Sequence, residues 1–284
     1  MRQSFYFYAN PHLPGSEAAA RALCECLLEK GASVYAQPWL AKRGVGMGMD
    51  EYALPRHTRC MIAFGGDGTL LRAAPLAAER DIPLLGVHTG TVGFLMHGDP
   101  SRPGDTARLL LGGDYPLQPC PMLRVKIDGQ QYLALNDVAL TRGEHPGVIR
   151  VRVEADGQLA FCAHGDGAVI STPLGATAYS LAAGGPIVRP DTKCLLAAPI
   201  CARELLLRPV VLPLEARLAL CAQGDPRRRL QLAIDGQILI PEEKEIRVEV
   251  ELAAERLLLL VPDKVSFFQT LRLKQRLWNQ DEQE

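Results

Sequence analysis

Three Asp-Gly dipeptides constrain the fold of the second half of the chain. Each stands between two runs of alternating apolar and polar residues, the strongest short-range signal of a β-hairpin. The three hairpins are LRVKI-DG-QQYLAL, GVIRVRVEA-DG-QLAFC and LQLAI-DG-QILI, with Asp128, Asp156 and Asp235 as the turn acids. The segment EIRVEVEL (245–252) alternates in the same way. The sequence therefore predicts a β-rich antiparallel domain at residues 119–254.

The first 118 residues differ, because short apolar runs alternate there with helical patterns. Ser16 is the expected N-cap of a helix that Gly31 ends, and Pro75 is expected to kink or end a later helix. The expected strands are residues 4–9, 33–37, 60–64 and 82–88. Strands joined by helical crossovers pair in parallel, so the sequence predicts an α/β fold that opens with a Rossmann-like domain at 1–118. A last helical pattern, VSFFQTLRLKQRLW, lies in the segment 255–284.

Composition and charge exclude several classes of protein. The 31 basic and 32 acidic residues of the 284-residue chain give a formal net charge of −1, so no basic surface for nucleic acid is expected. No apolar segment approaches the length of a membrane span, and Asn10-Pro11 interrupts the start too early for a signal peptide. The eight cysteines show no zinc-ligand spacing. We therefore expect reduced thiols, no metal site built by the protein, and a cytoplasmic location.

The run IAFGGDGTLLRAA (62–74) places one carboxylate, Asp67, among glycines after an apolar strand. Open α/β sheets bind ligands at the carboxyl ends of their strands. There Gly66 and Gly68 would let the backbone approach a phosphate, Thr69 would cap the next helix, and Arg72 could reach the same anion. A carboxylate beside phosphate is costly unless it accepts a proton or holds Mg²⁺. A solvated cap in a tight β–α turn is an equally good interpretation of this run alone.

A second glycine-rich run, DGAVISTPLGATAYSLAAGGPIV (166–188), favours ligand binding. Its small residues would let a flat ring approach the backbone, Tyr179 offers a stacking face, and Thr177 and Ser180 supply hydroxyl groups. The alternative is a buried β-turn-helix packed on its neighbour. Two such glycine-rich runs in one chain favour ligand binding over buried packing.

Six motifs in order resemble those of the NAD kinases, over most of the chain. They are GGDGTLLRA, GVHTGTVGFL, ALNDVAL, DGAVISTPLGATAYSLAAGGPI, PICARELLLRPVVLP and FFQTLRLKQRLW. GGDGT alone also occurs in diacylglycerol and sphingosine kinases. The family has an N-terminal α/β domain, a β-rich second domain, and a final helix that returns to pack on the first.

The resemblance implies roles for individual residues. Asp67 would be the base that takes the proton from the adenosine-ribose 2′-hydroxyl of NAD, with Mg²⁺-ATP or polyphosphate over the Gly65–Thr69 turn. Asn136 and Asp137 would hold ribose hydroxyls, and Asp166 would accept a hydrogen bond from an amide group of the dinucleotide. The remaining implied ligand-binding residues are His164, Thr177, Ala178, Tyr179, Ser180, Ala182, Asp235 and Gln237. Asp235 looks locally identical to Asp128 and Asp156, so its role rests on the family alone. The family also implies a homodimer or homotetramer.

Departures from the family pattern leave two other functions open. His164 stands where many members carry an arginine that influences the choice between NAD and NADH. The other departures are His88, Val92, Leu174, Ala176, Ala182 and Arg203. We expect an active but divergent enzyme. The alternatives are a lipid kinase that shares GGDGT and a dinucleotide sensor without turnover.

Overall fold

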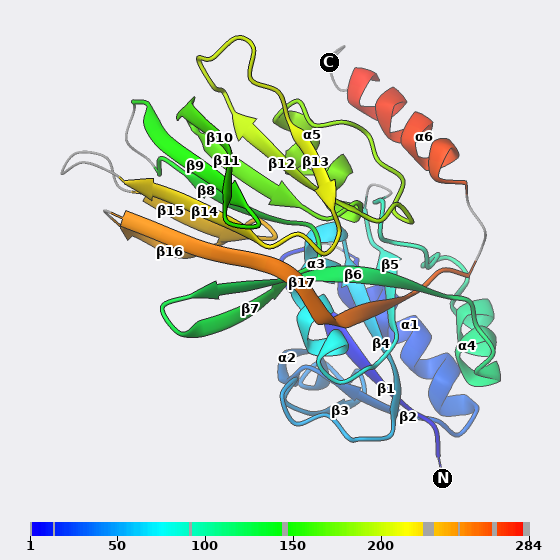
Figure 1. Ribbon diagram of the computed structural model, residues 1–284. Coiled ribbons are helices and arrows are strands. Elements are labelled where there is room, and N and C mark those ends of the chain that lie inside the picture. The colour runs from blue at the N-terminus through cyan, green and yellow to red at the C-terminus, as the bar shows by residue number, and fades with distance from the viewer. Residues whose placement is uncertain are drawn as a thin grey trace. The chain divides into compact units, whose positions relative to one another are not determined.

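The computed structural model describes residues 2–13, 15–90, 93–143, 147–223, 230–243, 245–262 and 266–280. It divides into two compact units, Met1–Pro119 with Leu257–Glu284 (unit 1) and Cys120–Arg256 (unit 2) (Figure 1). None of the helices in the described ranges is long and apolar enough to cross a lipid bilayer.

Unit 1 contains a parallel sheet with the strand order β5-β4-β1-β2-β3. The end of β17 joins it, because Leu259 pairs with Leu84. Its strands are β1 (Ser4–Ala9), β2 (Ser33–Ala36), β3 (Met47–Gly48), β4 (Thr58–Gly65) and β5 (Leu84–His88). Its helices are α1 (Ser16–Glu29), α2 (Pro38–Ala41), α3 (Asp67–Ala78), α4 (Pro103–Gly112) and α6 (Phe267–Gln280). The expected open α/β fold is confirmed.

Helices cover both faces of this sheet. Side chains of α1 and α4 share a core with Phe5 and Phe7 of β1 and with Leu85 of β5. On α3, Leu70 reaches Gly86, which alternates with Leu85 along β5 and so faces the opposite side. At the carboxyl ends of these strands, Gly66 alone joins β4 to α3, and a loop follows β5.

Two local expectations for unit 1, the N-caps, are wrong. Ser16 and Thr69 do not cap helices, because Gly15 and Gly66 hold the N-cap positions. The helix α1 begins at Ser16 itself, and α3 begins at Asp67, before Thr69 is reached. The hydroxyl of Ser16 instead pairs with that of Thr89 at 3.1 Å. Pro75 does not end α3, which runs on to Ala78. The three residues after Pro75 are buried, and their burial offsets the hydrogen bond that proline cannot donate.

Unit 2 consists of antiparallel sheets that enclose one apolar core. One sheet has the order β10-β9-β14-β17, with β6 paired to β17 and β7, and the other has the order β13-β12-β11-β8-β15-β16. The core takes side chains from both sheets, such as Val151 and Leu220 from the first and Leu140 and Ile170 from the second. This is the β-rich antiparallel domain that the Asp-Gly pattern predicts.

All three predicted hairpins form. Asp128, Asp156 and Asp235 each have a positive φ of 48–49°, and a glycine with positive φ follows each of them. The elements of unit 2 are β6 (Leu117–Ile127), β7 (Gln130–Ala134), β8 (Asp137–Thr141), β9 (Ile149–Ala155), β10 (Gln158–Gly165), β11 (Gly167–Ser171), α5 (Tyr179–Ala182), β12 (Cys194–Ile200), β13 (Val210–Pro213), β14 (Leu218–Gln223), β15 (Leu230–Ile234), β16 (Gln237–Glu243) and β17 (Glu245–Leu260).

Candidate active site

The glycine turn after β4 presents Asp67 at the start of α3. A Cβ atom on Gly65 would lie 2.2 Å from the hydroxyl oxygen of Thr69, so only glycine fits where the strand ends. Cβ atoms on Gly66 and Gly68 would meet nothing within 4 Å. The turn is therefore closed on the side of Thr69 and open around Gly66 and Gly68. The N-terminus of α3 favours the negative charge of Asp67 and would favour a phosphate group.

A loop that follows β5 holds the Asp67 carboxylate in place. The backbone N–H of Phe94 donates to Oδ2 at 2.9 Å, and that of Leu95 donates to Oδ1 at 3.1 Å. A Cβ atom on Gly93 would lie only 1.9 Å from Oδ1, so the loop can approach this closely only with glycine there. The carboxylate is thus fixed in position by the backbone. Arg72, one turn further along α3, is exposed.

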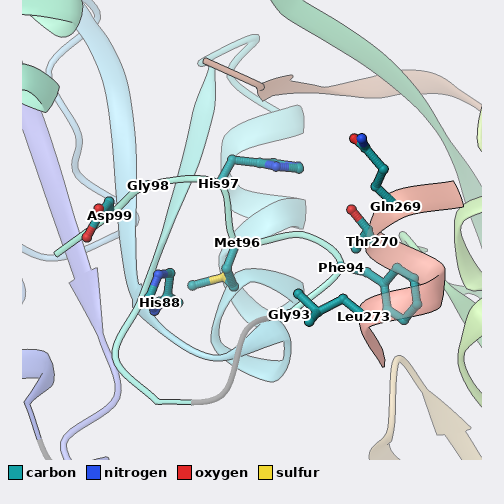
Figure 2. A pocket seen from close by; sticks show the side chains of 10 residues that line it. All are labelled: His88, Gly93, Phe94, Met96, His97, Gly98, Asp99, Gln269, Thr270 and Leu273. Atoms are coloured by element: carbon teal, nitrogen blue, oxygen red, sulfur yellow. The ribbon is translucent and has the colours of Figure 1, made fainter. Parts of the chain in front are cut away.

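A cavity of about 280 Å³ lies beside this loop and is shared with α6 (Figure 2). The ring of His97 points toward Gln269 and Thr270 of α6, and His88 and Asp99 lie at the other side (Figure 2). Burial lowers the pKa of His97, and the neighbouring Asp67 charge opposes that shift in part. A second hollow of about 570 Å³ lies between α1 and the loop after β5, lined by His88, Thr89 and Gly15 among others.

In unit 2, Asn136 ends the loop before β8 and Asp137 begins that strand, and both residues are buried. The Asp235 carboxylate accepts the backbone N–H groups of Leu135 and Asn136 at 2.7 Å and that of Asp137 at 3.0 Å. In return, the backbone N–H of Asp235 donates to the carbonyl of Asp137 at 2.9 Å. Asp235 therefore fixes the backbone from which Asn136 and Asp137 project.

Tertiary contacts distinguish Asp235 from the two turn acids that resemble it in sequence. The Asp156 carboxylate accepts the backbone N–H of Arg217 at an exposed position. Asp128 is also exposed. Of the three described Asp-Gly turns, the one between β15 and β16 lies against residues 135–137. Of the three turn acids, Asp235 therefore accepts hydrogen bonds from three backbone N–H groups.

The two carboxylates of this cluster titrate abnormally. Burial, and then the Asp235 charge, raise the pKa of Asp137 to about 7, while the backbone N–H of Tyr179 opposes the shift. Burial raises the pKa of Asp235 to about 6, against the effect of its three backbone donors. A buried carboxylate of this kind gains free energy when a ligand brings hydroxyl donors to it.

The second glycine-rich run folds back onto Asn136. The Thr172 hydroxyl donates to the carbonyl of Leu135 at 2.7 Å, and a Cβ atom on Gly175 would lie 2.2 Å from the carbonyl oxygen of Asn136. A 3₁₀ turn (Leu174–Thr177) leads to α5, where the Tyr179 side chain is 39% exposed. Oδ1 of Asn136 and Oγ of Ser180 are buried without a hydrogen-bond partner among the described residues. Such atoms are costly in a folded protein and are typical of sites whose partner is a ligand.

The remaining predicted residues of unit 2 have other partners or are exposed. Nε of Arg142 donates to Asp166 at 2.8 Å. Glu204 accepts the backbone N–H of His164 at 3.0 Å and contacts its Nδ1 at 2.8 Å, and these contacts lower the pKa of Glu204 to about 2. Gln237 and Ala182 are exposed, and Thr177 and Ala178 are partly exposed. His164 thus has a protein partner that the sequence analysis did not identify.

The structure gathers the predicted residues into two sets. Gly66, Asp67, Gly68 and Arg72 belong to unit 1, and the others belong to unit 2. Sequence reasoning missed the residues that hold them, which are Gly93, Phe94, Leu95, Arg142, Thr172 and Glu204. Gly93, the glycine of VGFL, was the sequence feature that could have indicated a close contact between this loop and Asp67. Val92 of that motif lies outside the described residues. Within the described ranges, no three His, Cys, Asp or Glu side chains are arranged to hold a metal ion.

Comparisons with known proteins agree along almost the whole chain. The family model of the ATP-NAD kinase N-terminal domain matches residues 5–115, and that of the ATP-NAD kinase C-terminal domain matches residues 135–261. The NAD kinase of Geotalea daltonii is 32% identical over 275 residues, which cover 94% of this chain and 96% of that protein. The NAD kinase of Heliobacterium modesticaldum is 34% identical over 255 residues, which cover 83% of this chain and 90% of that protein.

Solved structures show the same fold. The yeast NADH kinase complexed with NADH has a TM-score of 0.85 at 22% identity, covering 95% of this chain and 86% of that one. An NAD kinase from Archaeoglobus fulgidus in complex with ATP has a TM-score of 0.71 at 24% identity, covering 93% and 95%. With both domain models matched and relatives above 30% identity along nearly its full length, this chain belongs to the NAD kinase family.

Proposed function

We propose that this chain transfers the terminal phosphoryl group of ATP to the adenosine-ribose 2′-hydroxyl of NAD, forming NADP and ADP. The single observation that carries the proposal is the Asp67 carboxylate, which two backbone N–H groups hold at the carboxyl end of the sheet next to an open glycine turn. Family membership supports it, since both matched domain models are those of ATP-NAD kinases.

Asp67 would act as the general base. The 2′-oxygen forms a bond to the terminal phosphorus, the bond from that phosphorus to the bridging oxygen of ADP breaks, and the hydroxyl proton passes to Asp67. Each Asp67 oxygen accepts one backbone bond, and a carboxylate oxygen can accept two, so both keep room for a further partner. The turn residues Gly66 and Gly68 and the exposed Arg72 would face the donor phosphates.

The residues fit a divalent cation that arrives with the nucleotide. Mg²⁺ in such sites is held mainly by phosphate oxygens and water, with one or two carboxylates. Asp67 is the carboxylate of the glycine turn, and its unused acceptor positions could contact the ion. When bound, Mg²⁺ would neutralise charge that develops on the transferred phosphoryl group.

Residues of unit 2 would recognise the dinucleotide. Asn136 has a buried acceptor without a partner and Asp137 has a raised pKa, and both properties suit contact with ribose hydroxyl donors. Tyr179, with its exposed ring, would pack against a base, and Ser180, Thr177, Ala178 and Ala182 would border it. For Asp235 we propose an indirect role, because its carboxylate already accepts three backbone donors. Asp166, His164 and Gln237 remain predicted contacts of the dinucleotide.

Two departures from the family pattern are compatible with an active enzyme. Leu174 and Ala176 replace hydroxyl-bearing or small polar residues, but both side chains are buried, and Ala176 packs against Cys194 and Leu196. These two changes therefore alter packing and remove no hydroxyl from an exposed surface. Nothing in the comparisons favours a lipid kinase or a sensor without turnover.

We further propose that the chain forms a homodimer or homotetramer in the cytoplasm. Leu205 and Leu206 are 85% and 90% exposed on the loop between β12 and β13, and a second copy would cover them. No disulfide joins the cysteines of the described ranges, which suits a reducing compartment. Light scattering of the wild type and of the Leu205→Ser, Leu206→Ser double variant tests the assembly. A mass equal to that of one chain in the wild type would contradict it.

One coupled assay tests the proposed reaction and its donor. The purified protein is incubated with Mg²⁺, NAD and either ATP or inorganic polyphosphate, and NADP is measured with a dehydrogenase specific for it. Diacylglycerol replaces NAD in a parallel sample. NADP formed only when NAD and a phosphoryl donor are both present supports the proposal. ATP consumption with the lipid, or NAD binding without turnover, would support one of the alternatives.

A further inference from the structure

The C-terminal helix α6 is attached to unit 1 by few apolar contacts. Leu271 is buried, at 7% exposure, but Phe268 and Leu273 are 52% and 45% exposed. Part of the facing surface is the cavity of Figure 2, which α6 lines with Gln269, Thr270 and Leu273. The described side chains of α6 thus add little to the core, and three of them face the loop at residues 93–99 across this cavity.

One charged contact connects α6 to that loop. Nζ of Lys274 lies 5.8 Å from the centroid of the Phe94 ring, within the range of a cation–π interaction. The backbone N–H of the same Phe94 donates to Oδ2 of Asp67. A single residue thus contacts α6 through its ring and Asp67 through its backbone.

The loop after β5 has anchors on both sides of Phe94. Before it, the backbone N–H of Thr89 donates to the carbonyl of Gly65 at 3.0 Å. Leu95 and Met96 are buried at 2% and 4% exposure, and the backbone N–H of Gly98 donates to the carbonyl of Gly86 at 2.7 Å. Phe94 is only partly buried, and Gly93 before it has no side chain to pack. The partly buried Phe94 ring lies under Nζ of Lys274, so the contact with α6 adds to the bonds that position the Phe94 backbone.

We infer that Lys274 is a positioning residue for Asp67, because it holds the Phe94 ring and so keeps the N–H of Phe94 on Oδ2. The helix α6 then acts on the reaction without touching the substrate. This inference rests on the proposed role of Asp67 as the base, but its structural part, the order of the loop, does not.

The test combines amide exchange with kinetics in the full-length protein. Lys274→Met keeps the length of the side chain and removes the charge, Lys274→Arg restores a cation, and Arg272→Met removes an exposed cation from the same helix as the matched control. The readouts are hydrogen–deuterium exchange of a peptide that contains Phe94 and Leu95, kcat for NADP formation, and KM for ATP.

We expect Lys274→Met to raise exchange at Phe94 and to lower kcat, each by about two- to five-fold, the effect of one cation–π contact at a partly exposed site. KM for ATP should not change, Lys274→Arg should recover both readouts, and Arg272→Met should match the wild type. Phe94→Leu should show the same loss, and adding Lys274→Met to it should cause no further loss.

Three results would overturn the inference. One is normal exchange at Phe94 in Lys274→Met, and another is additive loss in the double variant. The third is a rise in KM for ATP with unchanged kcat, which would assign Lys274 to the donor phosphates. If exchange changes as expected but the wild type makes no NADP, the positioning contact stands and the proposed reaction fails.

Discussion

At the scale of single residues, the two backbone donors on Asp67 determine what its replacement does. Asparagine offers one acceptor oxygen and one NH₂ group, so Asp67→Asn can satisfy only one of the N–H groups of Phe94 and Leu95. We expect NADP formation to fall by about two to four orders of magnitude, the range for loss of a general base. NAD affinity should stay close to that of the wild type.

The matched control for this variant is Asp128→Asn, which makes the same chemical change in an exposed hairpin turn whose φ asparagine tolerates. It should leave kcat unchanged. If Asp67→Asn turned over NAD at a near-normal rate, Asp67 would be only a structural acceptor for the loop.

The raised pKa of Asp137 predicts how NAD affinity varies with pH. Ribose hydroxyls donate to the charged carboxylate, so bound NAD favours the deprotonated form and lowers the pKa from about 7. Binding then releases a proton. Affinity should rise with pH from about 6, by at most about tenfold per unit, and level off above about 8.

Calorimetric titrations of NAD at constant ionic strength measure this dependence. Asp137→Asn should bind NAD more weakly and with a flat profile, and Asp128→Asn should keep the wild-type slope. An affinity that falls as pH rises, or a slope that persists in Asp137→Asn, would rule out Asp137 as the titrating group.

At the scale of elements, the close approach of the loop after β5 to α3 requires glycine at position 93. Because a Cβ atom there would lie 1.9 Å from Oδ1 of Asp67, Gly93→Ala must displace either the loop or the carboxylate. We expect kcat to fall at least tenfold while the protein stays folded, since the three atoms nearest that Cβ all belong to the Asp67 side chain. Circular dichroism and the NADP assay together check this.

Gly104→Ala is the matched control, because its Cβ would meet nothing within 4 Å on α4. That variant should match the wild type in both measurements. Full activity in Gly93→Ala would show that the loop can hold Asp67 elsewhere, and the account of its fixed position would be wrong.

The short helix α5 offers a test of dinucleotide recognition. The Tyr179 ring is 39% exposed, so Tyr179→Ala should leave folding intact and weaken NAD binding by about 1 kcal/mol or somewhat more. Tyr52→Ala, which removes a 71% exposed ring from unit 1, is the control and should bind NAD normally. If Tyr179→Ala were largely unfolded and its folded fraction bound NAD with normal affinity, the Tyr179 ring would serve only to pack against the protein.

Local sequence patterns predicted which helices and strands form better than they predicted where each one begins and ends. The hairpins at Asp128, Asp156 and Asp235 follow from Asp-Gly and alternation, which are local signals. The N-caps predicted at Ser16 and Thr69 were wrong because an earlier glycine takes the cap position in each case, Gly15 for α1 and Gly66 for α3. Asp235 could not be told from the other turn acids, because the donors that distinguish it come from residues about 100 positions away in the sequence.

At the scale of the whole molecule, the change of hydrophobic pattern from the first part of the chain to the second was sufficient to predict the fold class. Alternating strands and helices predicted the parallel sheet of unit 1, and paired alternating runs predicted the antiparallel sheets of unit 2. The family resemblance rested on six motifs, and both domain models confirm it. The partners of His164 and Asp166 were not predictable, since Glu204 and Arg142 come from other elements and carry no pattern of their own.

The most direct test of the central claim is the position of the phosphate in the product. The wild-type protein is incubated with Mg²⁺-ATP and NAD, and in parallel with an NAD analogue that lacks the adenosine 2′-hydroxyl, and ADP and phosphorylated dinucleotide are both quantified. The account predicts one NADP, phosphorylated at the 2′ position, for each ADP, and no product from the analogue. A phosphorylated analogue, or ADP released without any NADP, would contradict it.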